Sequence, residues 1–221
     1  MKKSIARGIF VTGTDTGVGK TLVSAAILSA MRDEGLDYVP MKPVQTGCQR
    51  RRGKWVAPDL EFCLTTAGLK PGSKERADMA PYCFQPACSP HLAAREAGVT
   101  ISVSKVKAAI CRLARAHDGV VVEGAGGVLV PLNARQTMLD LMVVLGLPVV
   151  LVARPGLGTL NHTLLSLHLL RGAGLSVLGV VLNQSSPGRW GKIENDNART
   201  IERMGKVKVL ACMRFQEESR S

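Results

Sequence analysis

One continuous stretch near the start of the chain limits the folds that are open to it. The segment VTGTDTGVGKT, residues 11–21, follows an apolar run that begins at Gly8, and the apolar-periodic LVSAAILSAM comes directly after it. This order predicts a buried strand, a tight glycine loop and a helix. Such a unit is typical of a parallel sheet whose strands are joined by helical crossovers. The segment therefore favours an α/β fold.

The rest of the chain repeats the alternation of short β-branched runs with longer helical ones. Apolar residues make up 46% of the sequence and aromatic residues only 4%, a composition typical of a sheet buried on both faces. We therefore expect one α/β domain over residues 1–221, with a parallel sheet flanked by helices on both faces. The predicted strands are Gly8–Thr12, Tyr38–Lys42, Gly119–Glu123, Val149–Ala153, Val177–Leu182 and Val207–Ala211. The predicted helices are Lys20–Asp33, Ser104–Ala116, Thr137–Leu145, Thr159–Gly172 and Lys192–Met204.

The glycine loop has the chemistry of a phosphate-binding loop, or P-loop. Gly17 and Gly19 allow successive backbone N–H groups to point into one concavity at a helix N-terminus, where negative charge is stabilised. Lys20 is placed to reach the β- and γ-phosphates of a nucleotide, and the Thr21 hydroxyl to bind a bridging Mg²⁺. The strict motif has its first glycine at position 14, whereas this chain has Gly13 followed by threonine.

Polar side chains follow two other predicted strands at the edge of the sheet where ligands bind in such folds. Lys42, in MKPVQTG, is placed to neutralise charge that develops beside a triphosphate. Glu123, in VVVEGAGG, ends an apolar strand and is placed as an acid on the magnesium side of a nucleotide. Asp59, in APDLEF, is interpreted from the pattern alone as a helix N-cap.

Charge and cysteine content narrow the classes of partner. The net charge is 29 − 17 = +12, which attracts any polyanion without selecting one. The compact basic cluster at 50–54 is interpreted as a solvated loop. It lies within an irregular region, 45–100, that we expect to form long loops, short helices and a substrate lid.

The six cysteines lack zinc-site spacing, and the longest apolar stretch, 141–153, is too short to span a bilayer. With no secretory leader recognised, we expect a reduced cytoplasmic protein that binds no membrane.

Several motifs in a fixed order extend the interpretation beyond the P-loop. The motifs GTDTGVGKT, KPVQTG, VEGAGG and RPGLGTLNH, together with APYCF and SPHLAA, resemble those of the dethiobiotin synthetases over about residues 8–184. These enzymes are ATP-dependent carboxylases of biotin synthesis. The resemblance implies that 7,8-diaminopelargonic acid takes up carbon dioxide as a carbamate, which the γ-phosphate of ATP activates. Closure on the second amine then gives dethiobiotin, ADP and phosphate.

The same resemblance implies a role for each matched position. Lys42 would be the active-site lysine, with Lys20 as the second catalytic lysine, and Thr46 would contact the substrate. The magnesium ligands would be Thr21, Asp59 and Glu123. The nucleotide would be bound by Thr16, Gly17, Val18, Gly19, Lys20, Thr21 and Leu22 at its phosphates, by Glu123, Gly124, Ala125 and Gly126 alongside, and by Asn183 and Gln184 at the adenine. Leu157, Gly158, Thr159 and Asn161 would receive the substrate carboxylate across a homodimer interface.

One departure from the expected relatives leaves further protein classes open. The family commonly carries Gly-x-Ile-Pro against the base, whereas this chain reads ACMRF at 211–215. A regulatory ATPase of the partition or septum-placement type would share the fold and would use the positive charge to bind DNA or a membrane. Such proteins have a second lysine at the start of the loop, where this chain has Asp15, so nucleic-acid binding is not expected. The synthetase-like half of an amidotransferase and an inactive paralogue would also carry a P-loop of this kind.

Overall fold

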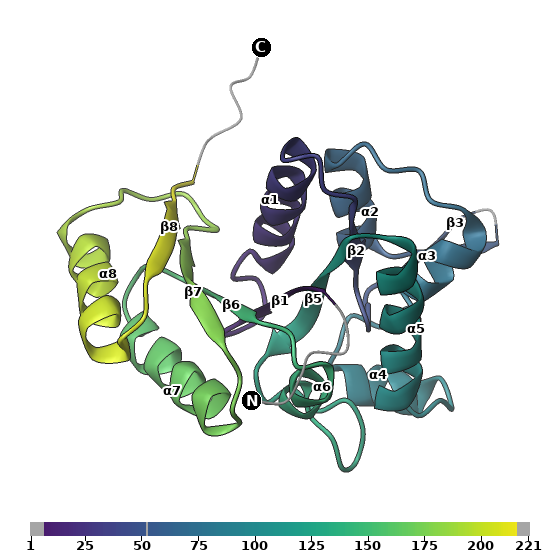
Figure 1. Ribbon diagram of the computed structural model, residues 1–221. Helices are drawn as coiled ribbons and strands as arrows, with labels where there is room; N and C mark the ends of the chain where they lie inside the picture. The colour runs from purple at the N-terminus through teal and green to yellow at the C-terminus, as the bar shows by residue number, and fades with distance from the viewer. Residues whose placement is uncertain (1–6, 52, 216–221) are drawn as a thin grey trace.

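The computed structural model describes residues 7–51 and 53–215, and a six-stranded parallel sheet organises them. The order across the sheet is β2-β5-β1-β6-β7-β8, so β1 lies in the interior between β5 and β6. Figure 1 shows the sheet running through the molecule with helices on both sides, as the sequence predicted. The strands are β1 (Gly8–Gly13), β2 (Tyr38–Met41), β5 (Gly119–Gly127), β6 (Val149–Ala153), β7 (Val177–Asn183) and β8 (Val209–Met213).

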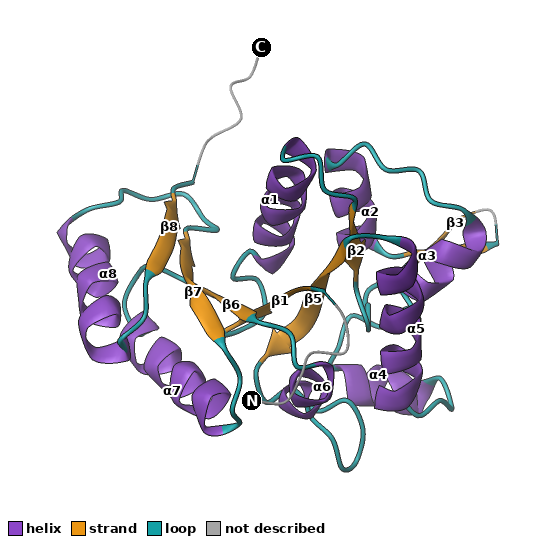
Figure 2. Cartoon of the chain, viewed as in Figure 1, coloured by secondary structure: helices purple, strands orange, loops and turns teal. Residues whose placement is uncertain are grey.

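The helices form two layers (Figure 2). On one face α1 packs against the sheet with α2 beside it, and on the other face α5, α6, α7 and α8 enclose the larger part of the core. The helices are α1 (Lys20–Asp33), α2 (Pro58–Thr66), α3 (Ser73–Met79), α4 (Pro90–Glu96), α5 (Val103–Ala116), α6 (Met138–Leu145), α7 (Thr159–Gly172) and α8 (Lys192–Gly205).

Side-chain alternation along the central strands explains why both layers form. In β1, Phe10 packs into the core under α5 and α6, whereas its neighbour Val11 packs into the core under α1. In β5, Val120 and Val122 share the side of Phe10, and Val121 shares the side of Val11. Successive strand residues point to opposite faces, so an uninterrupted apolar strand requires cover on both. The five-residue β6 is buried throughout for this reason.

The predicted element bounds are confirmed closely along most of the sheet and its covering helices. The bounds of α1, α7 and β6 are those expected from the sequence, and β8 lies two residues later than expected. Strand β5 continues through the glycines to Gly127, which pairs with Gly13 of β1. The sheet's carboxyl edge is thus lined by backbone rather than side chains at this point.

The basic cluster is a short hairpin and not the loop that the sequence predicted. Strands β3 (Gln49–Arg51) and β4 (Lys54–Val56) pair antiparallel, with Arg50 opposite Trp55. The Arg50 guanidinium carbon lies 5.7 Å from the centre of the Trp55 ring, and both side chains are exposed. A cation–π contact on the hydrated face thus accompanies the pairing. The rest of the irregular region holds α2, α3 and α4, in agreement with the expected short helices. No helix in the described part of the chain is long and apolar enough to cross a membrane.

Candidate active site

The glycine loop between β1 and α1 is held in place by the end of β7. Gly19 is the N-cap residue of α1 and has a φ of 96°, a left-handed conformation that glycine adopts without a steric penalty. A Cβ at this position would lie 2.0 Å from Nδ2 of Asn183. The same Asn183 nitrogen donates a hydrogen bond of 3.0 Å to the carbonyl of Val18. A glycine at position 19 is therefore required both by the backbone and by the neighbouring strand.

Lys20 begins α1 and lies along the loop in the position expected of a phosphate-binding lysine. Its ammonium donates to the carbonyl oxygen of Asp15 at 2.7 Å, and the residue is 6% exposed. Burial, followed by repulsion from the Lys42 ammonium, lowers the pKa of Lys20 to about 8. Two cations held this close in a buried site favour an anionic ligand, which would restore the pKa of Lys20.

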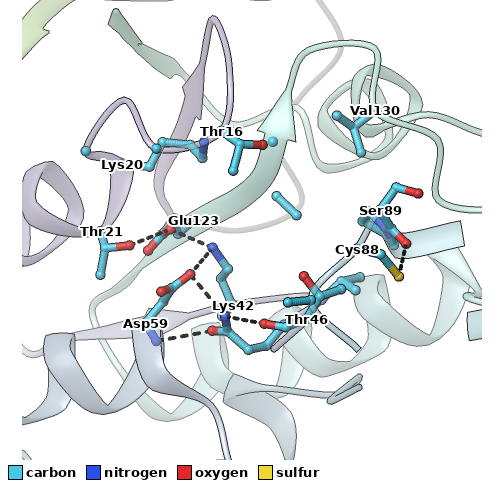
Figure 3. Close-up of a pocket in the computed structure, with 18 residues that line it drawn as sticks. Thr16, Lys20, Thr21, Lys42, Thr46, Asp59, Cys88, Ser89, Glu123 and Val130 are labelled. Atoms are coloured by element: carbon cyan, nitrogen blue, oxygen red, sulfur yellow. Dashed lines mark hydrogen bonds and ion pairs between the residues drawn. The ribbon is translucent and has the colours of Figure 1, made fainter. Parts of the chain in front are cut away.

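Lys42 lies between two carboxylates at the carboxyl end of β2. Its Nζ is 2.6 Å from Oε1 of Glu123 and 2.7 Å from Oδ2 of Asp59, and it also donates to the carbonyl of Gly124 at 3.2 Å. Figure 3 shows the ammonium pointing into this group from below the glycine loop. Burial alone would lower the pKa of Lys42, but attraction to Glu123 and Asp59 raises it above the ordinary value. The lysine is thus a fixed, buried cation.

The interpretation of Asp59 as an N-cap is wrong. Pro58 is the first residue of α2, so the N-cap is Ala57, and Asp59 is the second helical residue. Its carboxylate accepts from the Lys42 ammonium and from Nε2 of Gln45 at 3.2 Å. Burial would raise the pKa of Asp59, but Lys42 lowers it, so the group is a carboxylate facing the pocket. Because α2 begins at Pro58, the N-cap is Ala57, and the Asp59 side chain does not cap the helix.

Oxygen ligands suited to a divalent cation converge beside Lys42. The Thr21 hydroxyl, at the start of α1, donates to Oε1 of Glu123 at 3.0 Å. Asp59, on α2, contacts the Lys42 ammonium that also pairs with Glu123. One hydroxyl and two carboxylates are the donors that Mg²⁺ prefers when the other positions are filled by water and phosphate. The donor set formed by Thr21, Asp59 and Glu123 therefore fits the metal implied by the sequence.

A cavity of about 650 Å³ opens between the glycine loop and the segment that follows β2. Eleven of the residues that we singled out from the sequence line it. They are Thr16, Gly17, Gly19, Lys20, Thr21, Lys42, Thr46, Asp59, Glu123, Ala125 and Gly126. The opposite wall consists of Ala87, Cys88, Ser89 and Pro90, with Val130 beyond them. The volume suits a small organic ligand beside the terminal phosphates of a nucleotide.

A second cavity, of about 770 Å³, lies on the other side of Gly19. The predicted nucleotide residues Leu22, Asn183 and Gln184 line it, and so does the segment 212–215, in which this chain departs from its expected relatives. The backbone N–H of Gln184 donates to the carbonyl of Met213 at 2.9 Å, so β7 and β8 hold this wall together. The two cavities meet at Gly19, as a nucleotide whose base and phosphates occupied them would require.

The residues expected to bind a substrate carboxylate lie apart from both cavities. Gly158 caps α7 in the left-handed region at a φ of 90°, and Thr159 begins the helix. Leu157 is fully exposed at 101%, and Asn161 is exposed as well. Among the described residues that line the first cavity, this group is not represented.

Three features of the site were not singled out from the sequence. Gln45 is buried against Asp59. It lies in the KPVQTG motif, in which only Lys42 and Thr46 have a role predicted from the sequence. The segment 87–90 forms a wall of the cavity, and SPHLAA was its only signal. Arg154 donates to Oδ2 of Asp15 at 3.3 Å and to the carbonyl of Thr16 at 3.2 Å, a contact that sequence spacing does not reveal.

Solved structures with a similar backbone include proteins of cell division. The chain superposes on one chain of the MinC:MinD cell division protein complex of Aquifex aeolicus with a TM-score of 0.62 and 13% identity, covering 96% of this chain and 83% of that one. The cell division ATPase MinD of Pyrococcus furiosus gives a TM-score of 0.60 at 21% identity, covering 94% and 82%. At this level of identity the similarity establishes the fold.

Sequence comparison establishes the family. A family model described as an AAA domain (AAA_26) matches residues 7–220. An ATP-dependent dethiobiotin synthetase BioD of Anaeromyxobacter dehalogenans (strain 2CP-1) is 49% identical over 217 residues, covering 96% of this chain and 92% of the relative. The enzyme of the same name from Anoxybacillus flavithermus is 40% identical over 205 residues, covering 92% and 90%. The chain therefore belongs to the dethiobiotin synthetase family of P-loop enzymes, as its motifs predicted.

Proposed function

We propose that the protein catalyses the ATP- and Mg²⁺-dependent conversion of 7,8-diaminopelargonic acid and carbon dioxide into dethiobiotin, ADP and phosphate. The observation that carries the proposal is the position of Lys42, a buried ammonium between Asp59 and Glu123 that faces the glycine loop across one cavity. Positioning and charge stabilisation are what phosphoryl transfer requires of a protein.

Each part of the site has its own task in the proposed reaction. The carbamate oxygen, already anionic, attacks the γ-phosphorus, and the bond between that phosphorus and the β–γ bridging oxygen breaks as ADP leaves. Lys20 and the backbone N–H groups of 16–21 hold the phosphates, and Lys42 stabilises the charge that develops between carbamate and phosphate. The second amine then attacks the carbamoyl carbon, phosphate leaves with the bonding electrons, and the amine loses a proton. No general base on the protein is needed for the first attack.

Thr21, Asp59 and Glu123 would hold the magnesium ion, which would neutralise charge on the β- and γ-phosphates. Support comes from the hydroxyl and the two carboxylates that converge on Lys42. The Lys42 ammonium contacts both carboxylates, so it lies beside the position that the metal would take.

The substrate carboxylate would be bound at the start of α7 of a second copy of the chain. Leu157, Gly158, Thr159 and Asn161 present a helix N-terminus, where a carboxylate is stabilised. The complete exposure of Leu157 supports an interface at this point. We propose accordingly that the enzyme is a homodimer. A cytoplasmic location is supported by the use of ATP and by six free cysteine thiols.

The decisive assay measures ADP release in the presence of ATP, Mg²⁺, bicarbonate and 7,8-diaminopelargonic acid, with mass spectrometry of the products. ADP release should depend on the diamine, and dethiobiotin should form in equal amount. Reactions without the diamine or without bicarbonate serve as controls. Diamine-independent turnover that DNA stimulates would contradict the proposal and favour a regulatory ATPase.

A further inference from the structure

Gln45 holds Asp59 through both ends of its carboxamide. Its Nε2 donates to Oδ2 of Asp59 at 3.2 Å and to the carbonyl of Thr46 at 3.1 Å, while its Oε1 accepts from the backbone N–H of Asp59 at 3.2 Å. A backbone N–H can only donate and an ionised carboxylate can only accept. The reversed amide would face donor with donor and acceptor with acceptor, so one orientation of the side chain satisfies the contacts.

The contact with Gln45 satisfies a backbone N–H at the start of α2 that the N-cap residue does not satisfy. The first N–H groups of a helix have no partner within the helix, and the methyl side chain of the N-cap Ala57 cannot accept a hydrogen bond. Gln45 accepts from the N–H of the second helical residue and, with the same group, fixes that residue's carboxylate. One carboxamide thus contacts both the backbone at the start of α2 and the carboxylate of Asp59.

Gln45 is itself held rigidly. It is 5% exposed, its N–H donates to the carbonyl of Tyr82 at 2.9 Å, and its carbonyl accepts from the N–H of Phe84 at 2.9 Å. Residue 45 pairs with residue 83 in an isolated parallel bridge. The bridge joins the segment after β2 to the chain that leads into the opposite wall of the cavity. A side chain anchored in this way can transmit position to its partner.

We propose that Gln45 is a positioning residue, which orients the Asp59 carboxylate for the divalent cation and sets its pairing with Lys42. The inference rests on the proposed function, since it concerns the same site. Both Gln45 and Lys42 contact Oδ2 of Asp59, so the carboxylate cannot turn without losing one of them. A residue that only capped the helix would contribute to stability and leave metal affinity unchanged.

The test measures Mn²⁺ binding to the complex of the protein with ADP, by the loss of the free Mn²⁺ signal in electron paramagnetic resonance. Gln45→Met keeps the length of the side chain and removes both contacts with Asp59. We expect this variant to weaken Mn²⁺ binding about 10-fold, because a group that orients a metal ligand is lost. Turnover should recover at high Mg²⁺ concentration. Mn²⁺ binding within twofold of the wild type would overturn the proposal.

A double-mutant cycle separates orientation from general damage. In the Asp59→Asn background, Gln45→Met should change Mn²⁺ affinity little, because the group that it orients is no longer a carboxylate. Equal losses in both backgrounds would overturn the proposal. Gln136→Met, which removes a carboxamide bonded to Asn133 in another loop, is the matched control and should bind Mn²⁺ as the wild type does.

Two provisions keep the result interpretable. If Gln45→Met does not fold, Gln45→Asn keeps the amide but is one methylene too short to reach both Asp59 groups, and the same loss of Mn²⁺ affinity is expected. Mn²⁺ binding is measured without diamine or bicarbonate, so it does not depend on the overall reaction. Failure of the wild type to form dethiobiotin would contradict the proposed function, whereas Mn²⁺ binding within twofold of the wild type by whichever Gln45 variant folds would contradict the role of Gln45.

Discussion

The two ends of the same neighbouring strands, β2 and β5, each hold a basic side chain between two carboxylates. At the carboxyl end Lys42 pairs with Asp59 and Glu123. At the amino end His117 places Nδ1 2.7 Å from Oδ2 of Asp37 and Nε2 2.6 Å from Oε1 of Glu75. The two arrangements share a basic group flanked by two acids but differ in their surroundings.

The difference lies in burial and in what adjoins each cluster. Lys42 is 6% exposed and its partners Glu123 and Asp59 are 5% and 31% exposed, whereas His117 is 15% exposed and its partners Asp37 and Glu75 are 53% and 32% exposed. The first cluster opens into the 650 Å³ cavity that the glycine loop also lines. A buried charge must be paired, and a cavity beside it allows a ligand to take over the pairing, whereas water can solvate an exposed cluster. The carboxyl end is therefore built for chemistry and the amino end for holding α3, α5 and β2 together.

Removal of the buried cation should give the largest effect. Lys42→Met leaves the Glu123 and Asp59 carboxylates without their ammonium, and we expect a loss of about 3–5 kcal/mol in the free energy of unfolding. Urea unfolding in metal-free buffer measures it. Turnover with the diamine should fall about 1,000-fold, because the developing charge loses its partner.

The double variant Lys42→Met/Glu123→Gln is the control for the stability effect. It removes the unpaired carboxylate and should recover part of the lost stability without restoring turnover. If the single variant unfolded at the urea concentration of the wild type, Lys42 would not be a buried, paired cation, and the contrast between the two ends would not hold.

Gly19 tests whether the carboxyl end is shaped to leave room for a phosphate. Gly19→Ala places a Cβ against Asn183 and a side chain in the left-handed region, which alone costs roughly 1–2 kcal/mol. We expect a larger loss than that, together with weaker ATP binding measured by calorimetry. Gly17→Ala is the matched control, since Gly17 has a φ of 72° but no atom within 4 Å of the added Cβ. Equal losses of stability in the two variants would show that contact with Asn183 is unimportant.

The sequence predicted those parts of the fold and the site in which periodicity or a motif acts locally. The buried β6 has the predicted bounds because it is a continuous apolar run, and α1 and α7 start at the predicted residues because each follows a glycine, Gly19 or Gly158. The loop at 16–21 and Glu123 were predictable because glycines and a carboxylate stand next to an apolar run, although β5 continues past Glu123 to Gly127.

Features that depend on contacts between distant segments were not predictable in the same way. The pattern around Asp59 indicates a cap because a capping aspartate and a ligand aspartate have the same local sequence, and only the fold brings Asp59 to Lys42. The β3–β4 hairpin was missed because a charged run has no alternation of apolar residues. Arg154 reaches the glycine loop across 138 positions of sequence.

At the amino end, His117 should make stability depend on pH to a modest extent. Burial acts to lower the pKa of His117, but hydrogen bonds to Asp37 and Glu75 raise it above 6.5 in the folded state. The stabilisation that protonated His117 contributes is complete below its unfolded-state pKa and is lost as the pH rises through its folded-state pKa. The free energy of unfolding of the wild type should exceed that of His117→Gln by about 1 kcal/mol near pH 5.5, with the difference shrinking as the pH rises through the folded-state pKa of His117.

Urea unfolding at several pH values measures this difference, and the other charges near the cluster, Asp118 and Arg32, are the same in both proteins. Dethiobiotin formation at pH 7.5 should be unchanged in His117→Gln. A loss of turnover as large as that of Lys42→Met would show that the amino end takes part in the chemistry.

The smallest effect is expected from a cation that lies at the carboxyl end but is exposed. Arg154 and its partner Asp15 have side chains 57% and 54% exposed, and their charged atoms are 3.3 Å apart. Exposed pairs gain little because water screens them, so Arg154→Gln should reduce the free energy of unfolding by no more than about 0.5 kcal/mol, and less at 0.5 M salt. Urea unfolding at low and high salt measures both values. If Arg154→Gln lost as much free energy of unfolding as Lys42→Met, a cation's contribution to stability would depend on its position at the carboxyl end of the sheet and not on its burial.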